Sequence, residues 1–402
     1  MMKLLNKTQL SLGLVLFNLF IAYVGIGLVV PVMPSIAHEM SLSGQTVGYL
    51  ISVFAFAQLL VSPLAGVWVN TLGRKKMIVI GLCLFAVSEV LFGLGHHMSV
   101  LFIARIMGGV SDAFIMPAVI TYIADKTTLA SRAKVLGYQA AAISSGFIIG
   151  PGLGGLIATF GIRAPFFVAA AFAFVAALVS FFMLEESLSK EELRRYRENQ
   201  QKISFLAEIK KSFAPAYFVP LLVVFVLSFG LAAYEMMFSL FVDAKFGFEI
   251  RQIAIIITVG SIFGVVAQIA FFENIVKAFG ERKLIHVSLV IAALFIVATV
   301  YVNSYWGIMV VSSIVFFACD MLRPAVTTLL SKLAGENQGF VAGMNSTYTS
   351  LGIIVGPAVG GILFDINIDF PYLFAACLLI VAFLLSAVGT RKKATTAQLA
   401  NK

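Results

Sequence analysis

The sequence predicts an all-α membrane protein whose twelve transmembrane helices form two pseudo-symmetric six-helix bundles. Three observations support this fold class. Hydrophobic residues make up 60% of the 402 residues and charged residues 12%, far outside the soluble range. Apolar runs of roughly 20 residues, long enough to cross a hydrocarbon core of about 30 Å, recur along the whole chain. Short phrases also recur at an interval of 206 or 207 residues.

The interval shows that the chain consists of two copies of one unit. Three phrases carry it: Pro-Ala-Val at Pro117 and Pro324, Gly-Arg-Lys-Lys at Gly73 answered by Gly-Glu-Arg-Lys at Gly280, and Gly-Pro-x-x-Gly-Gly at Gly150 and Gly356. Repeated membrane halves are typical of secondary transporters.

The apolar runs predict helices because lipid leaves no backbone polar group unpaired, and the alternation typical of a barrel is absent. The first run is too long for a signal peptide and lacks a cleavage site. We place the spans at 11–33, 46–69, 77–95, 99–124, 133–158, 164–184, 217–241, 252–272, 283–303, 306–330, 340–364 and 370–389.

One long polar segment divides the chain. It predicts an N-terminal bundle at 1–184, a linker at 185–213, a C-terminal bundle at 214–390 and a tail at 391–402. Within the linker, Glu191 precedes Arg195 and Glu198 precedes Lys202 by four residues. Such pairs favour a short surface helix, and the linker is too short and polar to bury a core.

The basic residues indicate topology. Of the 28 Lys and Arg, three lie in odd-to-even loops (Arg163, Lys245, Arg251) and two inside spans (Arg105, Arg323). The rest fall in the termini and the opposite loops. By the positive-inside rule, both termini and the linker are cytoplasmic. This topology accounts for the net charge of +9. The charge does not indicate nucleic-acid binding, because the basic stretches lack interleaved aromatic residues.

Several functions are disfavoured by what the chain contains. Its three cysteines (Cys83, Cys319, Cys377) lie within spans without metal-ligand spacing, and its four histidines are scattered. No Gly-Lys dipeptide occurs, which excludes a P-loop. We therefore expect no enzyme, no metal and no cofactor, and ATP is not the energy source; the proton gradient as energy source is what the family resemblance described below implies.

Three motifs resemble those of the major facilitator superfamily. The loop from Gly66 through Asn70, Gly73 and Arg74 resembles the family's Gly-x-x-x-Asp-x-x-Gly-Arg loop. Arg105 opens a span like the family's intramembrane Arg motif. The run Gly146-Phe-Ile-Ile-Gly150-Pro151-Gly152-Leu-Gly154-Gly155 looks like the antiporter signature.

Asn70 departs from the loop pattern, since the family has Asp there. A neutral amide can hydrogen-bond but supplies no charge. In the family this Asp is thought to help hold the cytoplasmic side closed. Either that contact is weakened or replaced here, or the loop still folds through Gly73 and the basic residues.

Nearly the whole chain is similar to the NorA/Bmr-type multidrug:proton antiporters of Gram-positive bacteria, with Leu227-Ser-Phe-Gly-Leu and Asp320-Met-Leu-Arg323-Pro324 particularly close. This resemblance implies a major facilitator fold and proton-coupled efflux of lipophilic, mainly cationic small molecules. It also implies a monomer in the bacterial cell membrane.

Six ionisable residues fall at membrane depth: Glu89, Arg105, Asp112, Glu235, Asp320 and Arg323. Each would cost about 2.5–3.5 kcal/mol on a lipid-facing helix centre. They must instead face the bundle interior, pair or line a wet cavity.

The spacing of these charges predicts their pairing. Asp320 and Arg323 share one helix face, so they either neutralise each other or form a site in which Arg323 tunes a cation- or proton-binding Asp320. Glu235 has no basic neighbour along its own helix, which favours proton uptake. Arg105 and Asp112 are two turns apart, which favours an ion pair over direct substrate contact by Asp112. For Glu89 a structural hydrogen bond is favoured.

The remaining candidates come from resemblance. Glu235 and Asp320 match the acidic positions that the family uses for protons and substrate. The substrate pocket would include Tyr23, Ile26, Phe54, Gln58, Met116, Phe147, Phe316 and Asn345. An aromatic, apolar site with carboxylates suits flat lipophilic cations.

Gly146, Gly150, Pro151, Gly154 and Gly155 serve either as a hinge during rocking or as close helix packing. Two alternatives to multidrug efflux stay open. One is a dedicated exporter or importer of one metabolite, such as a polyamine or sugar. The other is a non-transporting membrane receptor or membrane enzyme.

Overall fold

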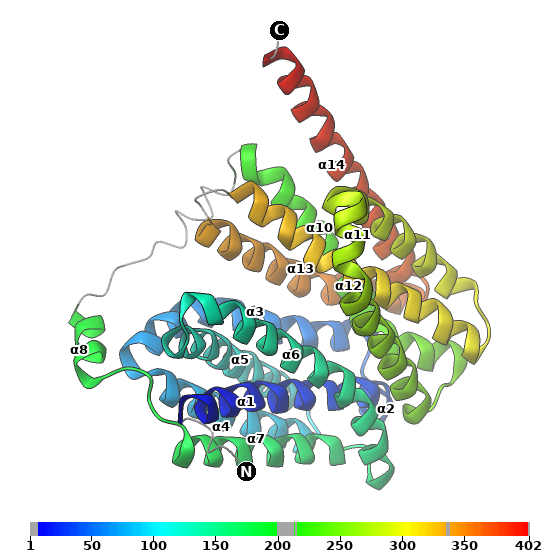
Figure 1. Cartoon of the computed structure of the whole chain (residues 1–402). Coiled ribbons are helices and arrows are strands. Elements are labelled where there is room, and N and C mark those ends of the chain that lie inside the picture. The colour runs from blue at the N-terminus through cyan, green and yellow to red at the C-terminus, as the bar shows by residue number, and fades with distance from the viewer. Residues whose placement is uncertain (1–6, 199–212, 214, 335–337, 401–402) are drawn as a thin grey trace, which may run out of the picture. The chain divides into compact units, whose positions relative to one another are not determined.

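The computed structural model describes residues 7–198, 213, 215–334 and 338–400, and helices make up nearly all of this part (Figure 1). The first half holds α1 (Lys7–Val29), η1 (Val30–Val32), α2 (Met33–Glu39), α3 (Gly44–Leu72), α4 (Arg74–Leu94), α5 (Met98–Lys126), α6 (Leu129–Ile157), η2 (Ala158–Phe160) and α7 (Ala164–Met183). After them come α8 (Lys190–Glu198), α10 (Pro215–Phe246), α11 (Ile250–Tyr301), α12 (Tyr305–Ala334), α13 (Gln338–Ile366) and α14 (Phe370–Ala400).

The described helices account for the predicted spans. Eleven are long and apolar enough to cross a membrane. The longest, α11, has 52 residues and is interrupted at Gly280, whose φ of 77° and ψ of 158° are not helical. Because an L-residue is strained at that φ, glycine makes this turn possible. The predicted spans 252–272 and 283–303 lie on either side of it.

The chain folds into two compact units. Unit 1 comprises residues 1–41, 53–203 and 250–255, and unit 2 comprises 42–52, 204–249 and 256–402. The boundaries thus cut through α3 and α11. The start of α3 packs with unit 2, where Gly44 and Gln45 donate backbone N–H groups to the Asp365 carboxylate at 2.7 and 2.9 Å.

In unit 1, α1 packs on α6 and α7, and α4 packs on α5 and α7. The core contains the fully buried Leu19, Ile78 and Tyr122. Buried polar side chains pair across helices, as Asn18 donates to the Ser180 hydroxyl at 2.7 Å. An unpaired buried amide would be costly, so this bond fixes α1 against α7.

In unit 2, α10 packs on α13 and α14. Its core is aromatic: the Tyr234 ring lies edge-on to Tyr372, with centroids 5.2 Å apart, and Phe241 contacts the same Tyr372 ring at 4.1 Å. All three side chains are fully buried.

The repeated glycines bring helices of each unit into backbone contact. A Cβ at Gly150 would lie 2.7 Å from the α-carbon of Gly27, and one at Gly154 would lie 2.2 Å from the Leu28 carbonyl oxygen. Gly356 repeats this in unit 2 against Phe229. Small residues allow such close approach in membranes. Close packing is therefore observed, whereas the hinge role of this motif stays a prediction.

Ion pairs recur in both halves with reversed polarity. Arg163 binds Glu39 at 3.1 Å, and 206 residues later Asp369 binds Lys245 at 2.7 Å. Both cations also donate to carbonyls at the end of the helix that follows the Gly73 or Gly280 turn, Arg163 to Gly93 at 2.9 Å and Lys245 to Val300 at 2.5 Å. The same ion pair is therefore present in both halves, with the acidic and the basic position exchanged.

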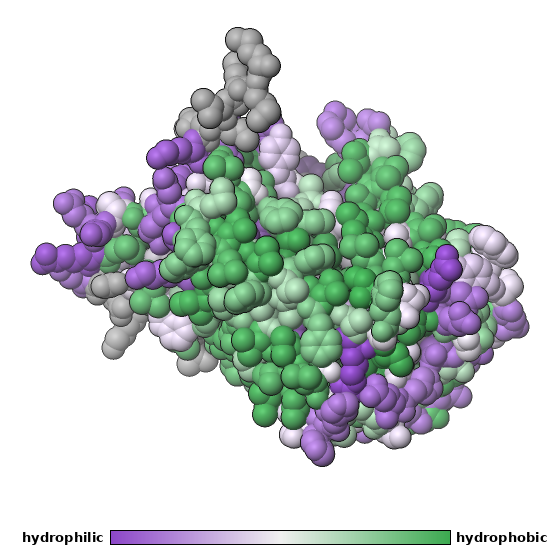
Figure 2. All heavy atoms as spheres, turned by 90° about the horizontal axis from the view of Figure 1, so that it is seen from below, coloured by the Kyte–Doolittle hydropathy of each residue, from purple (hydrophilic) through white to green (hydrophobic). Residues whose placement is uncertain are grey.

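The surface and the linker also match the prediction. Apolar side chains cover much of the face drawn in Figure 2, and hydrophilic ones gather toward its margins. Phe174, Phe181 and Phe182 of α7 are exposed by more than half, as lipid contact requires. The predicted linker helix is α8, although its described ion pair joins Arg194 to Glu198. Lys202 lies outside the described residues.

Candidate functional site

The six intramembrane charges are divided equally between the two units. Glu235, Asp320 and Arg323 belong to unit 2 and are called the unit 2 triad. Glu89, Arg105 and Asp112 belong to unit 1 and are called the unit 1 triad, although Asp112 lies apart from the other two in its interactions.

In the unit 2 triad, Arg323 of α12 binds Glu235 of α10. Its Nη2 donates to both carboxylate oxygens at 2.7 Å. The Glu235 side chain is 21% exposed and that of Arg323 55% exposed. Glu235 has no basic neighbour along its own helix, but it is paired across helices, with a partner 88 residues along the chain.

Asp320 is the third member of the triad. It is half-buried and interacts electrostatically with Arg323 and Glu235. No hydrogen bond or ion pair to a described residue is seen for it. The predicted mutual neutralisation with Arg323 is thus only partial, since the guanidinium is directed at Glu235. With all three groups ionised, two negative charges share one positive charge.

Two glycines of α11 pack closely against α12 beside Asp320. A Cβ at Gly264 would lie 2.1 Å from Asp320 Oδ2, so a larger residue there would displace the carboxylate. A Cβ at Gly260 would likewise lie 2.5 Å from the Phe316 ring. Phe316 in turn lies edge-on to Tyr234 and Phe238, at 6.4 and 6.1 Å. An aromatic group therefore stands one helical turn from the carboxylate.

In the unit 1 triad, Asp112 of α5 accepts a hydrogen bond from the amide of Gln58 on α3. Tyr23 interacts electrostatically with Asp112 and stacks edge-on to Phe147 at 5.1 Å. The structure thus brings together four of the predicted residues. Phe147 is 40% exposed, which leaves its ring accessible.

Arg105 does not pair with Asp112 as predicted. Its guanidinium lies over the Phe92 ring, 4.2 Å from the centroid, and it interacts electrostatically with Glu89. A planar guanidinium suits an aromatic face. The predicted hydrogen bond of Glu89 is not seen either, because its Oε2 is buried without a partner among the described residues.

Other predicted pocket residues take part in packing. Ile26 packs against Phe85, Ala86 and Ala173, and Met116 packs on the unit 1 core. The Phe54 ring lies against Gly108. Asn345 is half-buried on α13, and no hydrogen bond or ion pair to a described residue is seen for it.

The turn between α3 and α4 holds a second group of charges. Arg74 is 3% exposed and lies 2.9 Å from Asp125, an ion pair whose geometry is not that of a hydrogen bond. The Glu186 carboxylate accepts the backbone N–H groups of Arg74 and Lys75 at 2.9 and 3.2 Å. A carboxylate at a helix N-terminus is stabilising.

Around this turn, Gly73 takes a φ of 106°, and no ion pair or hydrogen bond to a described residue is seen for Asn70. Gly66 has nothing within 4 Å of an added Cβ. The negative charges at this turn come from Asp125 and Glu186.

Asp125 and Glu186 were missed by sequence reasoning. The repeat interval could have found Asp125, because Arg74 and Asp125 correspond to Glu281 and Lys332, which also form an ion pair. Nothing in the sequence marks Glu186, which follows a long apolar helix and meets the turn only in three dimensions. Similarly, no spacing rule connects Gln58 with Asp112.

Comparisons with known proteins agree with this architecture. The Major Facilitator Superfamily model matches residues 15–272 and 221–401. The chain is 51% identical over 399 residues to Multidrug resistance protein 2 of Bacillus subtilis (strain 168), covering 99% of this chain and all of that one. It is 40% identical over 359 residues to the quinolone resistance protein NorA of Staphylococcus aureus, covering 89% and 91%.

Solved structures match the fold. A bacterial homolog of the human lysosomal transporter Spinster, in an inward-facing and occupied conformation, aligns with a TM-score of 0.75 at 15% identity over 95% of this chain and 96% of that one. The human organic anion transporter MFSD10 aligns with a TM-score of 0.68 at 18% identity, over 94% and 99%. With its repeated halves, its helices and its motif loop, the chain belongs to the Major Facilitator Superfamily.

Proposed function

We propose that this protein is a multidrug efflux transporter that exports amphipathic, mainly cationic compounds in exchange for protons, by alternating access. It works without a cofactor and catalyses no reaction. Family membership and the names of relatives at 51% and 40% identity support transport of small molecules. Multiple membrane-spanning helices make it a multi-pass protein of the bacterial plasma membrane.

The observation that carries the proposal is the charge imbalance of the unit 2 triad. Arg323 is engaged by Glu235, so Asp320 has no full partner. A carboxylate in that position binds either a proton or an organic cation, and binding one excludes the other. Phe316 adds an aromatic face on the same helix, which favours flat cations.

The transport cycle follows from this exchange. With Asp320 ionised and the site open to the cytoplasm, the cation binds. After the site opens outward, a proton neutralises the carboxylate and the cation loses its counter-charge. The protonated carrier then returns. Each inward proton gains roughly 2.3 kcal/mol per 100 mV of membrane potential, besides the pH gradient.

The other triad tunes the same chemistry. Asp112, held by Gln58 beside Tyr23, is a second carboxyl for protons or substrate. Arg105 and Arg323 adjust the local charge. Tyr23, Phe147 and Phe316 contact substrate, with Ile26, Phe54, Met116 and Asn345 shaping the pocket.

Both termini and the turn at Gly73 are cytoplasmic in this proposal, in agreement with the distribution of basic residues. The Gly66–Arg74 segment then gates the cytoplasmic side, with Asp125 and Glu186 in the role of the missing Asp at position 70. The protein acts as a monomer, because each unit carries its own cluster.

The test is proton-driven efflux of ethidium from energised vesicles. Asp320→Asn and Glu235→Gln should abolish efflux at unchanged expression, and Glu198→Gln, an exposed carboxylate on α8, serves as the matched control. Full ethidium efflux by Asp320→Asn would defeat the proposal. A narrow competition profile across dyes would instead indicate a dedicated metabolite carrier.

A further inference from the structure

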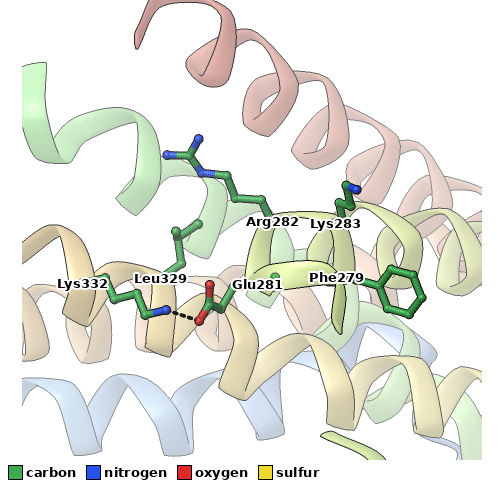
Figure 3. A pocket seen from close by; sticks show the side chains of 7 residues that line it. Phe279, Glu281, Arg282, Lys283, Leu329 and Lys332 are labelled. Carbon is green, nitrogen blue, oxygen red and sulfur yellow. Dashed lines mark hydrogen bonds and ion pairs between the residues drawn. The ribbon is translucent and has the colours of Figure 1, made fainter. Parts of the chain in front are cut away.

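The turn at Gly280 carries a cationic cavity that transport does not use. The cavity has a volume of about 530 Å³ and is lined by Phe279, Gly280, Glu281, Arg282, Lys283, Leu329 and Lys332. Figure 3 shows α11 contributing Phe279, Arg282 and Lys283, and α12 contributing Leu329 and Lys332. All of these residues belong to unit 2.

Among the described residues, the charges that line the cavity are not balanced. Lys332 binds Glu281 (Figure 3), whereas Arg282 and Lys283 are exposed and make no ion pair with a described residue. The lining therefore carries three cations and one carboxylate, and only Lys332 is directed at that carboxylate (Figure 3). Net charge of +2 in a concave site favours an anion.

In the first half of the chain, the equivalent turn has a carboxylate beside it. There the equivalent Gly73 lies against Glu186, and an added Cβ would be 2.3 Å from its Oε2. At Gly280 an added Cβ meets nothing within 4 Å. The two turns share a positive φ, 106° and 77°, but only the first has a carboxylate of the chain beside it among the described residues.

The rim of the cavity is apolar. The Phe279 side chain is 61% exposed, and Leu329 is half-buried beside Lys332. The turn lies between the predicted spans 252–272 and 283–303, so the predicted topology puts it at the depth of lipid headgroups. A site with cations inside and exposed apolar side chains at its edge fits a phosphate that carries acyl chains.

We propose that the cavity at Gly280 binds the phosphate of an anionic phospholipid from the cytoplasmic leaflet. The lipid phosphate takes the place beside Gly280 that Glu186 takes beside Gly73. Arg282 and Lys283 hold the phosphate, and Phe279 and Leu329 contact the chains. The leaflet rests on the proposed orientation of the protein, but binding itself does not require transport.

The test titrates the detergent-purified full chain with phosphatidylglycerol and phosphatidylcholine and counts bound lipids by native mass spectrometry. The unaltered protein should prefer phosphatidylglycerol. Removing one cation should weaken that binding roughly fivefold, the usual contribution of a basic residue at an anionic surface. Arg282→Gln with Lys283→Gln should therefore reduce the preference by roughly 25-fold, while the conservative Arg282→Lys with Lys283→Arg should keep it.

Two variants make the test specific. Lys76→Gln, the matched change in the first half, should leave lipid binding unchanged. Glu281→Gln removes the one carboxylate and releases Lys332, so it should tighten binding about fivefold. Loss of binding in this variant, or equal losses in Lys76→Gln and Lys283→Gln, overturns the proposal.

Inorganic phosphate distinguishes the two sources of the anion. Millimolar phosphate that displaces phosphatidylglycerol completely would assign the site to a soluble anion and overturn the lipid proposal. Lipid binding should also persist in Asp320→Asn, which lacks transport. Failure of the lipid site and failure of the efflux proposal are thereby separated.

Discussion

Asp125→Asn tests whether the ion pair at the first turn is structural. The change leaves the Arg74 guanidinium, which is 3% exposed, without its ion-pair partner. Removing one partner of a fully buried pair costs about 3–5 kcal/mol. Asp125 is 24% exposed, and Arg74 keeps a hydrogen bond to the Val69 carbonyl. A cost of roughly 2–3 kcal/mol is therefore expected.

The second half supplies a matched control. Lys332 occupies the position that corresponds to Asp125, but its side chain is 62% exposed. The Glu281 side chain that remains is 12% exposed, but solvent reaches this pair through Lys332, which brings its contribution to roughly the 0–1 kcal/mol of exposed pairs. Lys332→Gln should therefore destabilise the protein far less than Asp125→Asn, although both remove one ion pair from equivalent turns.

Thermal unfolding with a thiol-reactive dye measures both changes. The exposed Cys377 is first replaced by Ala in every variant. Cys319 is 1% exposed, so its thiol then reacts when unit 2 opens, and the half-buried Cys83 reports on unit 1. At about 2–4 °C per kcal/mol for a unit of this size, Asp125→Asn should lower Tm by about 4–12 °C and Lys332→Gln by at most about 4 °C. Equal shifts, or a larger shift for Lys332→Gln, would refute the burial argument.

Two further predictions concern packing and pH. Gly154→Ala places a Cβ 2.2 Å from the Leu28 carbonyl oxygen. Separating α1 from α6 should cost about 1–3 kcal/mol, whereas Gly66→Ala, with nothing within 4 Å, should leave Tm unchanged. In the linker, hydrogen bonds from Ser189 lower the pKa of Glu192 below 4.5. Because the folded pKa is depressed, this cap stabilises α8 above pH 4.5 and is lost as the pH falls through the folded value. The protection factor of the α8 amides, which is the intrinsic exchange rate at each pH divided by the measured rate, should therefore fall as the pH falls below 4.5. An unchanged protection factor in that range would contradict the prediction.

The helices could be predicted from the sequence because lipid enforces a single solution for long apolar runs. The repeat interval also located both glycine turns, at Gly73 and Gly280. Segment ends were less predictable. The predicted first span ends at residue 33, but helical structure continues past Pro31 to Glu39, through the 3-10 turn η1 and then α2. Proline near the start of a helical turn costs no hydrogen bond.

The pairings inside the membrane could not be predicted in the same way. Spacing along one helix identifies shared faces, so it favoured Arg323 with Asp320 and Arg105 with Asp112. The structure instead pairs Arg323 with Glu235 and places Arg105 over Phe92. These partners lie on other helices, and helix rotation decides them. That rotation depends on close approaches such as Gly264 against Asp320, which no local pattern encodes.

The sign-reversed ion pairs limit how the two halves can be recombined. A hybrid that joins the Glu39 region of the first half to the Asp369 region of the second would bring two carboxylates together, and the reciprocal hybrid would oppose Lys245 to Arg163. Crossovers within a half therefore create like-charge contacts, whereas exchange of whole halves preserves every pair. After the duplication, paired charge changes have thus made the acidic and basic members of each pair depend on each other. Each half can therefore be exchanged as a whole, but not in part, without opposing like charges.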